Sequence, residues 1–185
     1  RGEASALGKP SEHSTPRYGR PRVDHEKIMI LTRMLLEAIG EDPKRPGIAD
    51  TPRRVADYWR EFIEYDPGRV DTTFEAVQAE QMVIVRGMRV WSLCEHHLLP
   101  FWCDVTCGYI AQDKVLGLSK FARIAHGVSH RIGLQERLVN DTAAVLRDIL
   151  RTENVAVIAS GEHLCMTMRG ARTPARMISS SLHGV

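Results

Sequence analysis

The sequence predicts an α+β domain, because helical and strand patterns occur in separate blocks along the chain. Apolar residues first recur every three or four positions; stretches rich in Val, Ile and Met follow, and the helical period then returns. At 185 residues, with 43% apolar and 26% charged residues, the chain has the size and composition of one globular domain. We expect that domain at residues 23–185, after a flexible tail at 1–22 that is rich in Gly, Pro, Ser and Arg.

Two helices are predicted before the strands. From Asp24 onward, apolar side chains recur at helical spacing as far as Gly40, a residue type that commonly ends helices. These apolar positions are Ile28, Leu31, Met34, Leu35, Ala38 and Ile39. Further along, Asp50 is a favourable capping residue and Pro52 suits a first helical turn, so a second helix is expected toward Phe62.

Two strands and then two helices are predicted next. Residues 81–90 and 102–110 predict strands, because the first is rich in Val, Met and Ile and the second alternates in part. Residues 119–132 and 136–151 carry helical periodicity.

A final pair of strands is predicted near the end of the sequence. Residues 154–160 form a short apolar run, and residues 163–169 alternate partly. No internal repeat is visible at any of the usual periods.

The charge and hydropathy of the chain exclude some partners. A formal net charge of +2 is too mild for a nucleic-acid-binding face. No stretch of 18 apolar residues predicts a membrane span, and residues 1–22 lack the apolar segment of a secretory signal. We therefore expect a cytoplasmic protein that binds neither nucleic acid nor membrane.

Thiols and imidazoles gather at two places in the sequence. Cys94, His96 and His97 lie within four positions, and His163 and Cys165 form a second group. Catalytic zinc takes three nitrogen or sulfur ligands and keeps a fourth position for water, so a Cys2His set suits hydrolysis. Taken singly, each residue is more often a buried thiol or an ordinary histidine. Their density, in a chain without a secretory signal, favours a metal site over disulfides.

Cys103 and Cys107 have a spacing that invites a redox interpretation. On one strand, four residues at roughly 3.3 Å each separate their Cα atoms by about 13 Å, whereas a disulfide spans at most about 7 Å. We therefore expect buried free thiols at both positions.

Four segments, in this order, closely resemble the signature segments of type I GTP cyclohydrolase: SLCEHHLLPF, VLGLSKFARI, LQERL and EHLCMTMRG. The resemblance covers residues 23–185, and four motifs in register are far more specific than one. It implies the tunnelling fold, an antiparallel sheet with two helices packed on one face, here preceded by N-terminal helices. It also implies a homo-oligomer, a decamer of two pentameric rings with active sites at subunit boundaries.

The same resemblance implies the metal and the reaction. A zinc ion would be held by Cys94, His97 and Cys165. The reaction would open the imidazole ring of GTP, release C8 as formate and reclose the ring to give 7,8-dihydroneopterin triphosphate, the first step of pterin biosynthesis. His163 corresponds to the acid/base histidine, and imidazole suits proton transfer to the purine N7 because its pKa is near 6.5. His96 is implied as a second site histidine; the alternative is that it supports the metal ligands.

Substrate contacts follow from the resemblance as well. Glu136 would accept the N1–H and the exocyclic amine of guanine, although a solvated glutamate at a helix start would look the same. Gln135 would add a contact to the base or to its ring-opened form. The triphosphate would be held by Ser119, Lys120, Arg123, Arg169 and Arg54. Phosphates favour Arg and Lys donors and helix N-termini, but without the resemblance these cations would be ordinary surface residues.

One departure and two alternatives complete the predictions. Residues 102–104, Trp-Cys-Asp, stand where the family commonly has Gly-Lys, which puts the local chain shape in question but not the metal. A tunnelling-fold relative such as the nitrile reductase branch would use a cysteine nucleophile and NADPH without zinc; the complete thiol and imidazole set opposes it. A binding module with a structural zinc is opposed by three ligands rather than four. The pathway that the product feeds and any regulatory partner are not predicted.

Overall fold

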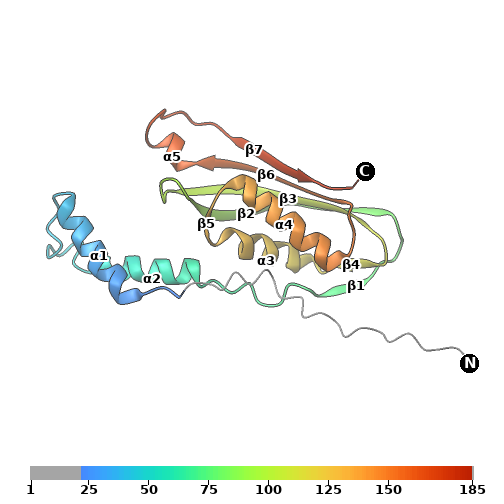
Figure 1. Ribbon diagram of the computed structural model, residues 1–185, viewed down its shortest axis with the longest axis horizontal. Coiled ribbons are helices and arrows are strands. Elements are labelled where there is room, and N and C mark those ends of the chain that lie inside the picture. Colours follow the sequence, from blue (N-terminus) through green and yellow to red (C-terminus); the bar gives the residue numbers. More distant parts are fainter. Residues whose placement is uncertain (1–21, 185) are drawn as a thin grey trace, which may run out of the picture.

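The computed structural model describes residues 22–184, which form a long sheet with helices on one face and a helical hairpin at one end (Figure 1). The predicted tail at residues 1–22 lies outside the described residues except for its last position.

The helical hairpin consists of α1 (His25–Ala38) and α2 (Thr51–Ile63). Both helices occur where they are predicted, the first from its apolar spacing and the second from Asp50 and Pro52. Gly40 follows the first helix with a φ of 87°, in the left-handed region that glycine adopts without strain. The two helices pack against each other and extend away from the sheet (Figure 1). Asp50 precedes α2 as predicted, but its carboxylate pairs with Arg53 instead of capping the backbone.

Five strands form the main sheet, in the order β5-β2-β3-β6-β7. Their bounds are Ile132–Gly133 for β5, Gln81–Cys94 for β2, Pro100–Ala111 for β3, Val155–His163 for β6 and Met177–Leu182 for β7. Neighbouring strands are antiparallel, except that β5 runs parallel to β2. A separate two-stranded ribbon pairs β1 (Thr73–Glu75) with β4 (Lys114–Leu116).

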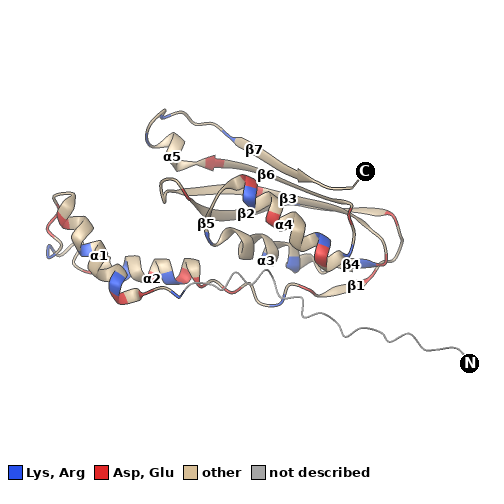
Figure 2. Ribbon diagram, in the orientation of Figure 1, with Lys and Arg blue, Asp and Glu red and all other residues tan. Residues whose placement is uncertain are grey.

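Two helices, α3 (Leu118–Ser129) and α4 (Gln135–Leu150), cover one face of the sheet (Figure 1). Their apolar sides form one core with every second residue of β3, because successive strand residues point to opposite faces. Charged residues lie on the outer surface of α4 (Figure 2). The predicted α+β class, with an antiparallel sheet and two helices on one face, is confirmed.

Cys103 and Cys107 belong to this core. Both lie on the helix-covered side of β3 with side chains that are 0% exposed, and both are free thiols, as predicted.

The C-terminal part of the chain differs from the prediction. The expected strand at residues 163–169 is wrong, because β6 ends at His163 and the short helix α5 (Leu164–Thr167) follows. The last strand is β7, whose three consecutive serines give little strand signal; its conformation comes from pairing with β6. The predicted helix at 119–132 is also too long, because α3 ends at Ser129 and Ile132 belongs to β5.

Within residues 22–184, no helix is both long and apolar enough to cross a membrane. The cytoplasmic location stays a prediction.

Candidate metal centre and active site

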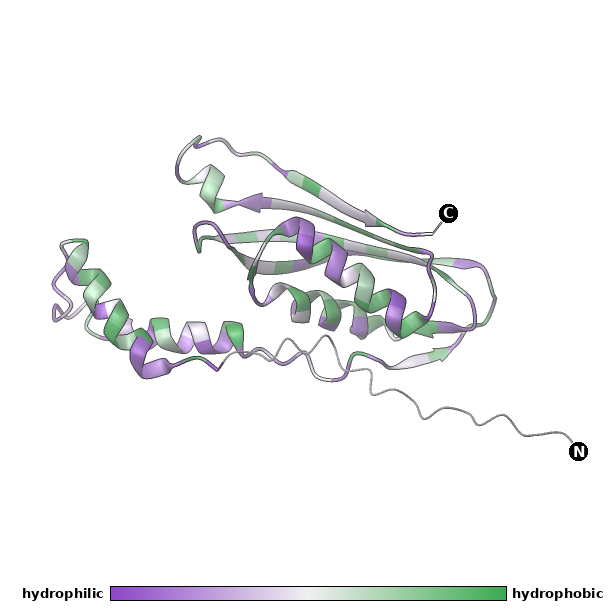
Figure 3. Ribbon diagram, viewed as in Figure 1, coloured by the Kyte–Doolittle hydropathy of each residue, from purple (hydrophilic) through white to green (hydrophobic). Residues whose placement is uncertain are grey.

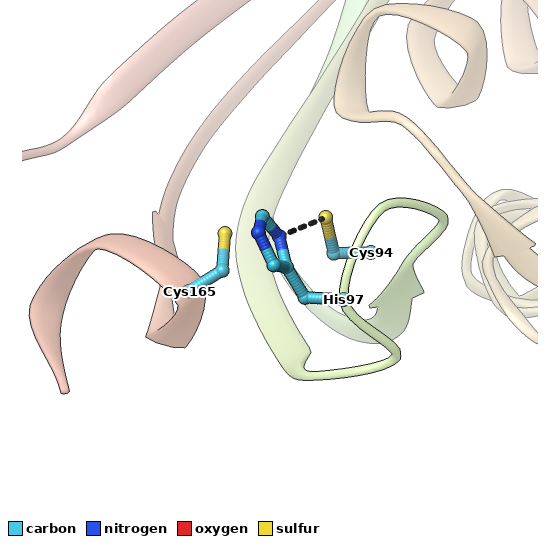
Figure 4. A group of neighbouring side chains, drawn as sticks. All are labelled: Cys94, His97 and Cys165. Atoms are coloured by element: carbon cyan, nitrogen blue, oxygen red, sulfur yellow. Dashed lines mark hydrogen bonds between the residues drawn. The ribbon is translucent and has the colours of Figure 1, made fainter. Parts of the chain in front are cut away.

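The three residues predicted to bind a metal converge at one end of the sheet (Figure 4). One potential ligand atom from each of Cys94, His97 and Cys165 lies within 4.8 Å of the others. The Sγ atom of Cys94 is 3.8 Å from Nδ1 of His97. In a tetrahedral zinc site with bonds of about 2.0–2.3 Å, ligand atoms are roughly 3.5–3.8 Å apart. The donor types and the Cys94–His97 spacing therefore fit a zinc ion.

A tight turn after β2 presents two of these side chains. Cys94 ends the strand, and its carbonyl oxygen accepts hydrogen bonds from the backbone N–H groups of His97 at 3.3 Å and Leu98 at 2.8 Å. Leu98 has a φ of 55°, in the left-handed region that leucine rarely adopts. The chain then reverses, and the N–H of Cys94 donates to the carbonyl oxygen of Leu99 at 2.9 Å. The turn fixes Cys94 and His97 relative to each other.

Strand pairing brings the third residue to this turn. In the antiparallel register of β3 and β6, Phe101 lies opposite His163, so β6 ends where β3 begins. Helix α5 starts directly after His163 and carries Cys165 on its single turn. The register of these two strands therefore places Cys165 beside the turn that holds Cys94.

Neighbouring groups change the protonation preference of Cys165. Burial raises the pKa of this thiol, the adjacent Cys94 raises it further, and the charge of Arg169 lowers it. Two thiolates side by side repel, whereas a divalent cation stabilises both. The pair thus favours binding a cation over standing as two free thiolates.

His163, the predicted acid/base residue, lies beside the cluster. Its ring stacks on Phe101, with centroids 4.5 Å apart and an interplanar angle of 10°. Its Nε2 atom is 3.0 Å from Oε1 of Gln135. Burial lowers the pKa of His163 below its ordinary value, and the carboxylate of Glu136 opposes that shift. A lowered pKa keeps the imidazole neutral at pH 7 and able to accept a proton.

Gln135 and Glu136, the first two residues of α4, have side chains that point in different directions. Gln135, predicted to contact the base, is 0% exposed, and its amide faces His163 and the sheet. Glu136 is exposed and lies close enough to His163 to influence its charge. This arrangement leaves Glu136 accessible to a ligand and Gln135 covered.

His96 is exposed on the same turn as the metal ligands. Its Nδ1 atom lies 4.0 Å from the Sγ of Cys94, at the limit of a weak contact with sulfur. Its ring meets that of His97 edge to face, with centroids 6.2 Å apart. His96 is thus next to the cluster while its side chain stays open to solvent.

Two of the predicted phosphate-binding residues lie far from the cluster. Ser119 and Lys120 are in the first turn of α3, which follows the end of the sheet where Gln81 pairs with Ala111. Cys94 ends β2 at the opposite end, and a strand of 14 residues spans roughly 40 Å. One chain therefore does not bring these residues together.

The other predicted phosphate-binding residues are spread over three elements. Arg123 is exposed on α3, and its Nη1 donates to the carbonyl oxygen of Pro67 at 2.7 Å. Arg54 is exposed on α2 and pairs with Asp50 at 3.4 Å. Arg169 is exposed just after α5 and acts electrostatically on Cys165, which places it near the cluster.

Several residues that support the site were not singled out from the sequence. Phe101 belongs to a quoted motif but had no assigned role. Gly161 on β6 gives room to the buried amide: a Cβ at this position would lie 2.4 Å from the carbonyl oxygen of Trp102 and 2.7 Å from Oε1 of Gln135. A glycine inside a strand often marks such a close approach, and that signal could have found it.

An ion pair also ties the metal turn to α4. Nη1 of Arg137 lies 3.1 Å from a carboxylate oxygen of Glu95. Both side chains are partly exposed, so the pair orients the turn more than it stabilises the fold.

The chain is similar to a well-defined family over most of its length. A family model described as GTP cyclohydrolase I matches residues 28–185. A protein of Carboxydothermus hydrogenoformans named GTP cyclohydrolase 1 is 44% identical over 168 residues, covering 88% of this chain and 88% of that protein. Proteins of the same name from a Sulfurihydrogenibium species and from Hyperthermus butylicus are 45% and 44% identical, each over 88% of this chain and over 87% and 83% of their own lengths.

One solved structure is also similar. The apo form of an archaeosine synthase QueF-Like protein matches with a TM-score of 0.45 and 17% identity, over 56% of this chain and 96% of that one. A similarity of this size carries no argument about function.

Proposed function

The chain belongs to the GTP cyclohydrolase I family, and from that premise we propose that it hydrolyses GTP to 7,8-dihydroneopterin triphosphate and formate with the help of zinc. This is the first step of pterin biosynthesis, toward folate or tetrahydrobiopterin. The observation that carries the proposal is the cluster of Cys94, His97 and Cys165 directly beside the neutral imidazole of His163.

The donor set of the cluster supports zinc as the metal. Two sulfurs and one imidazole nitrogen are soft and borderline ligands, which zinc accepts and magnesium or calcium does not. Three protein ligands leave a fourth position, as catalytic zinc sites require. A zinc ion bound here would lower the pKa of its water toward about 7 and so supply hydroxide for attack on C8.

His163 is the residue proposed to move protons during ring opening. Its lowered pKa makes it neutral before reaction, so that it takes up a proton and passes it to the purine nitrogen that leaves C8. Stacking on Phe101 keeps the ring in one plane throughout. His96, exposed and adjacent to Cys94, is proposed as the second histidine facing the substrate.

Glu136 is proposed to bind the guanine edge. It is exposed in the first turn of α4 and close to His163, so a base held there would lie near the imidazole. A carboxylate accepts two parallel hydrogen bonds from N1–H and the exocyclic amine, an arrangement that adenine does not offer.

The triphosphate is proposed to lie between copies of the chain. Ser119, Lys120 and Arg123 belong to the far half of the helical layer, whereas Arg169 is near the cluster. If a neighbouring copy contributes α3, and a further copy Arg54, the anion-binding side chains reach one substrate. Their separation within one chain supports an assembly, for which we propose the decamer of two pentameric rings implied by the family.

Exposed apolar residues support the assembly as well. Much of the α1 ribbon has a hydrophobic colour (Figure 3). Five large apolar residues of α1 and its C-cap are about half or more exposed: Ile30, Leu31, Met34, Leu35 and Ile39. An open groove of about 570 Å³ is lined mainly by apolar residues of α1, its C-cap and α2, together with Leu98 of the turn that carries Cys94 and His97. Patches of this kind commonly mark contacts between proteins.

The test is to follow formate release from GTP together with pterin fluorescence of the oxidised product. We expect both signals, and we expect His163→Ala to lose them while retaining zinc. Glu136→Ala should weaken GTP binding without changing the zinc content. Formate without a pterin product would contradict the proposed reaction, and loss of zinc from His163→Ala would make this residue a ligand.

A further inference from the structure

The buried amide of Gln135 has an orientation that its partners determine. Its Nε2 atom lies 3.0 Å from the carbonyl oxygens of both Ala159 and Met177 and 3.2 Å from Oγ of Ser179. Backbone carbonyls only accept hydrogen bonds, so the atom facing them must be the NH₂ group. A flipped amide would set its oxygen against two carbonyl oxygens, with no donor from either.

The amide oxygen therefore faces His163, at 3.0 Å from Nε2 of the ring. Because an amide oxygen accepts and never donates, the imidazole must carry its hydrogen on Nε2. The neutral ring then has a single basic nitrogen, Nδ1. One buried side chain thus selects the tautomer of the neighbouring histidine.

Two further residues hold this arrangement in place. Phe101 packs flat against the imidazole, at 4.5 Å between centroids, which limits rotation of the ring. Gly161 has no Cβ, and a Cβ there would lie only 2.7 Å from Oε1 of Gln135. The space that admits the amide oxygen is thus built into β6.

We propose that Gln135 is a positioning residue that holds His163 in the Nε2–H tautomer, so that Nδ1 is the nitrogen that exchanges protons with the substrate. This inference rests on the proposed function, because it assumes that His163 moves the proton. It gives Gln135 a task other than the base contact implied by the family resemblance. With its side chain fully buried, the amide acts on the reaction through His163 and not by touching the base.

The direct test is solid-state ¹⁵N NMR of the zinc-loaded protein labelled at histidine, with the His163 signals assigned by their loss in His163→Asn. We expect a protonated Nε2 and an unprotonated Nδ1 for His163. A hydrogen on Nδ1 would overturn the proposal. This spectrum needs no substitution at Gln135 and no turnover, so it is independent of whether GTP is the substrate.

Kinetics of Gln135→Met provide the second test, because methionine keeps the unbranched shape but has no amide. We expect a second tautomer to appear and kcat to fall about 10- to 100-fold, as for other residues that orient a site histidine, with KM for GTP and zinc content unchanged. The matched control is Ser179→Ala, which removes one partner of the amide nitrogen but keeps the Gln135–His163 contact, and which should behave like the parent. A raised KM with unchanged kcat would instead assign Gln135 to the base and overturn the proposal.

Failure of the proposed function would look different from failure of this inference. Parent protein that releases no formate from GTP would refute the function, whatever the tautomer. Parent protein that releases formate while His163 carries its hydrogen on Nδ1 would refute the role of Gln135 alone.

Discussion

The four cysteines occupy two regions of the molecule with opposite character. Cys94 and Cys165 come from different elements, β2 and α5, and meet beside His97 at one end of the sheet. Cys103 and Cys107 lie on one strand in the middle of the core and are 0% exposed. One pair of cysteines thus lies beside another potential metal ligand, His97, and the other pair lies among apolar side chains.

Surroundings decide what each pair can do. Burial, with a smaller effect of Asp104, raises the pKa of Cys103 to about 12, and burial alone raises that of Cys107 to about 12. Such thiols are protonated at neutral pH and pack as small apolar side chains. At the metal corner, formed by Cys94, His97 and Cys165, each thiol lies close to an imidazole and to the other sulfur, and the three groups can bind a cation together. Whether a cysteine of this protein can bind a metal therefore depends on the residues around it.

The largest predicted effect separates the two pairs by activity. Cys94→Ala or Cys165→Ala should reduce bound zinc from about one per chain to almost none and lower formate release about 1,000-fold or more, since a catalytic metal contributes several kcal/mol. Metal analysis and a formate assay on the same samples measure both. Cys103→Ala is the matched control and should keep its zinc. Equal loss of zinc from the control would erase the distinction.

A second prediction concerns thiol reactivity after zinc is removed with a chelator. At pH 8 a thiol with a pKa of about 12 is ionised in only about one molecule in ten thousand, and burial also blocks access. The half-buried Cys165 should therefore react with a disulfide reagent well before Cys103 and Cys107. The two buried thiols should react only when the protein unfolds. Mass spectrometry of the modified peptides gives the order. Early labelling of Cys107 would show that the core opens locally.

A third prediction concerns stability. Cys107→Ser places a hydroxyl in the apolar core and should lower the free energy of unfolding by about 1–3 kcal/mol. Cys165→Ser, compared in zinc-free protein, should change it by much less because that side chain is half-buried. Urea unfolding at one fixed protein concentration measures both changes. A larger loss for Cys165→Ser would mean that the corner stabilises the fold without its metal.

The smallest predicted effect extends the contrast to two histidines. The pKa of His163 is lowered by burial and raised by Glu136, and its ring contacts Gln135. For His126, on α3, burial is the one cause that lowers the pKa from the ordinary value of 6.5. Between the lowered folded value and 6.5 the unfolded state binds more protons, so stability falls as the pH drops below about 6.5. His126→Gln should flatten this decline, measured as the urea midpoint at pH 7.5 and 5.5. If the stability of the variant falls with pH as steeply as that of the parent, other titrating groups cause the decline.

Much of the metal corner could be predicted because its residues are local in sequence. Cys94, His96 and His97 share one turn, and the helix that carries Gln135 has a clear apolar period. The position of Cys165 depends on the register of β3 and β6, which side-chain patterns do not fix. Its segment also alternates like a strand, although it forms the turn of helix α5.

The orientation of the Gln135 side chain is the clearest example of a feature that could not be predicted from the sequence. A glutamine at the start of a helix is usually solvated, and only the combined positions of β6, β7 and His163 bury this one. The serine-rich β7 was missed for a similar reason, since its strand conformation depends on its neighbour β6.

The most direct measurement follows formate release from GTP in one preparation that is stripped of metal and then reloaded with zinc in steps. We expect no turnover in the stripped protein and a rate that rises in proportion to zinc until about one ion per chain is bound. Stripped protein that continues to release formate, or a rate that does not follow zinc, would contradict a reaction that depends on a metal held by Cys94, His97 and Cys165.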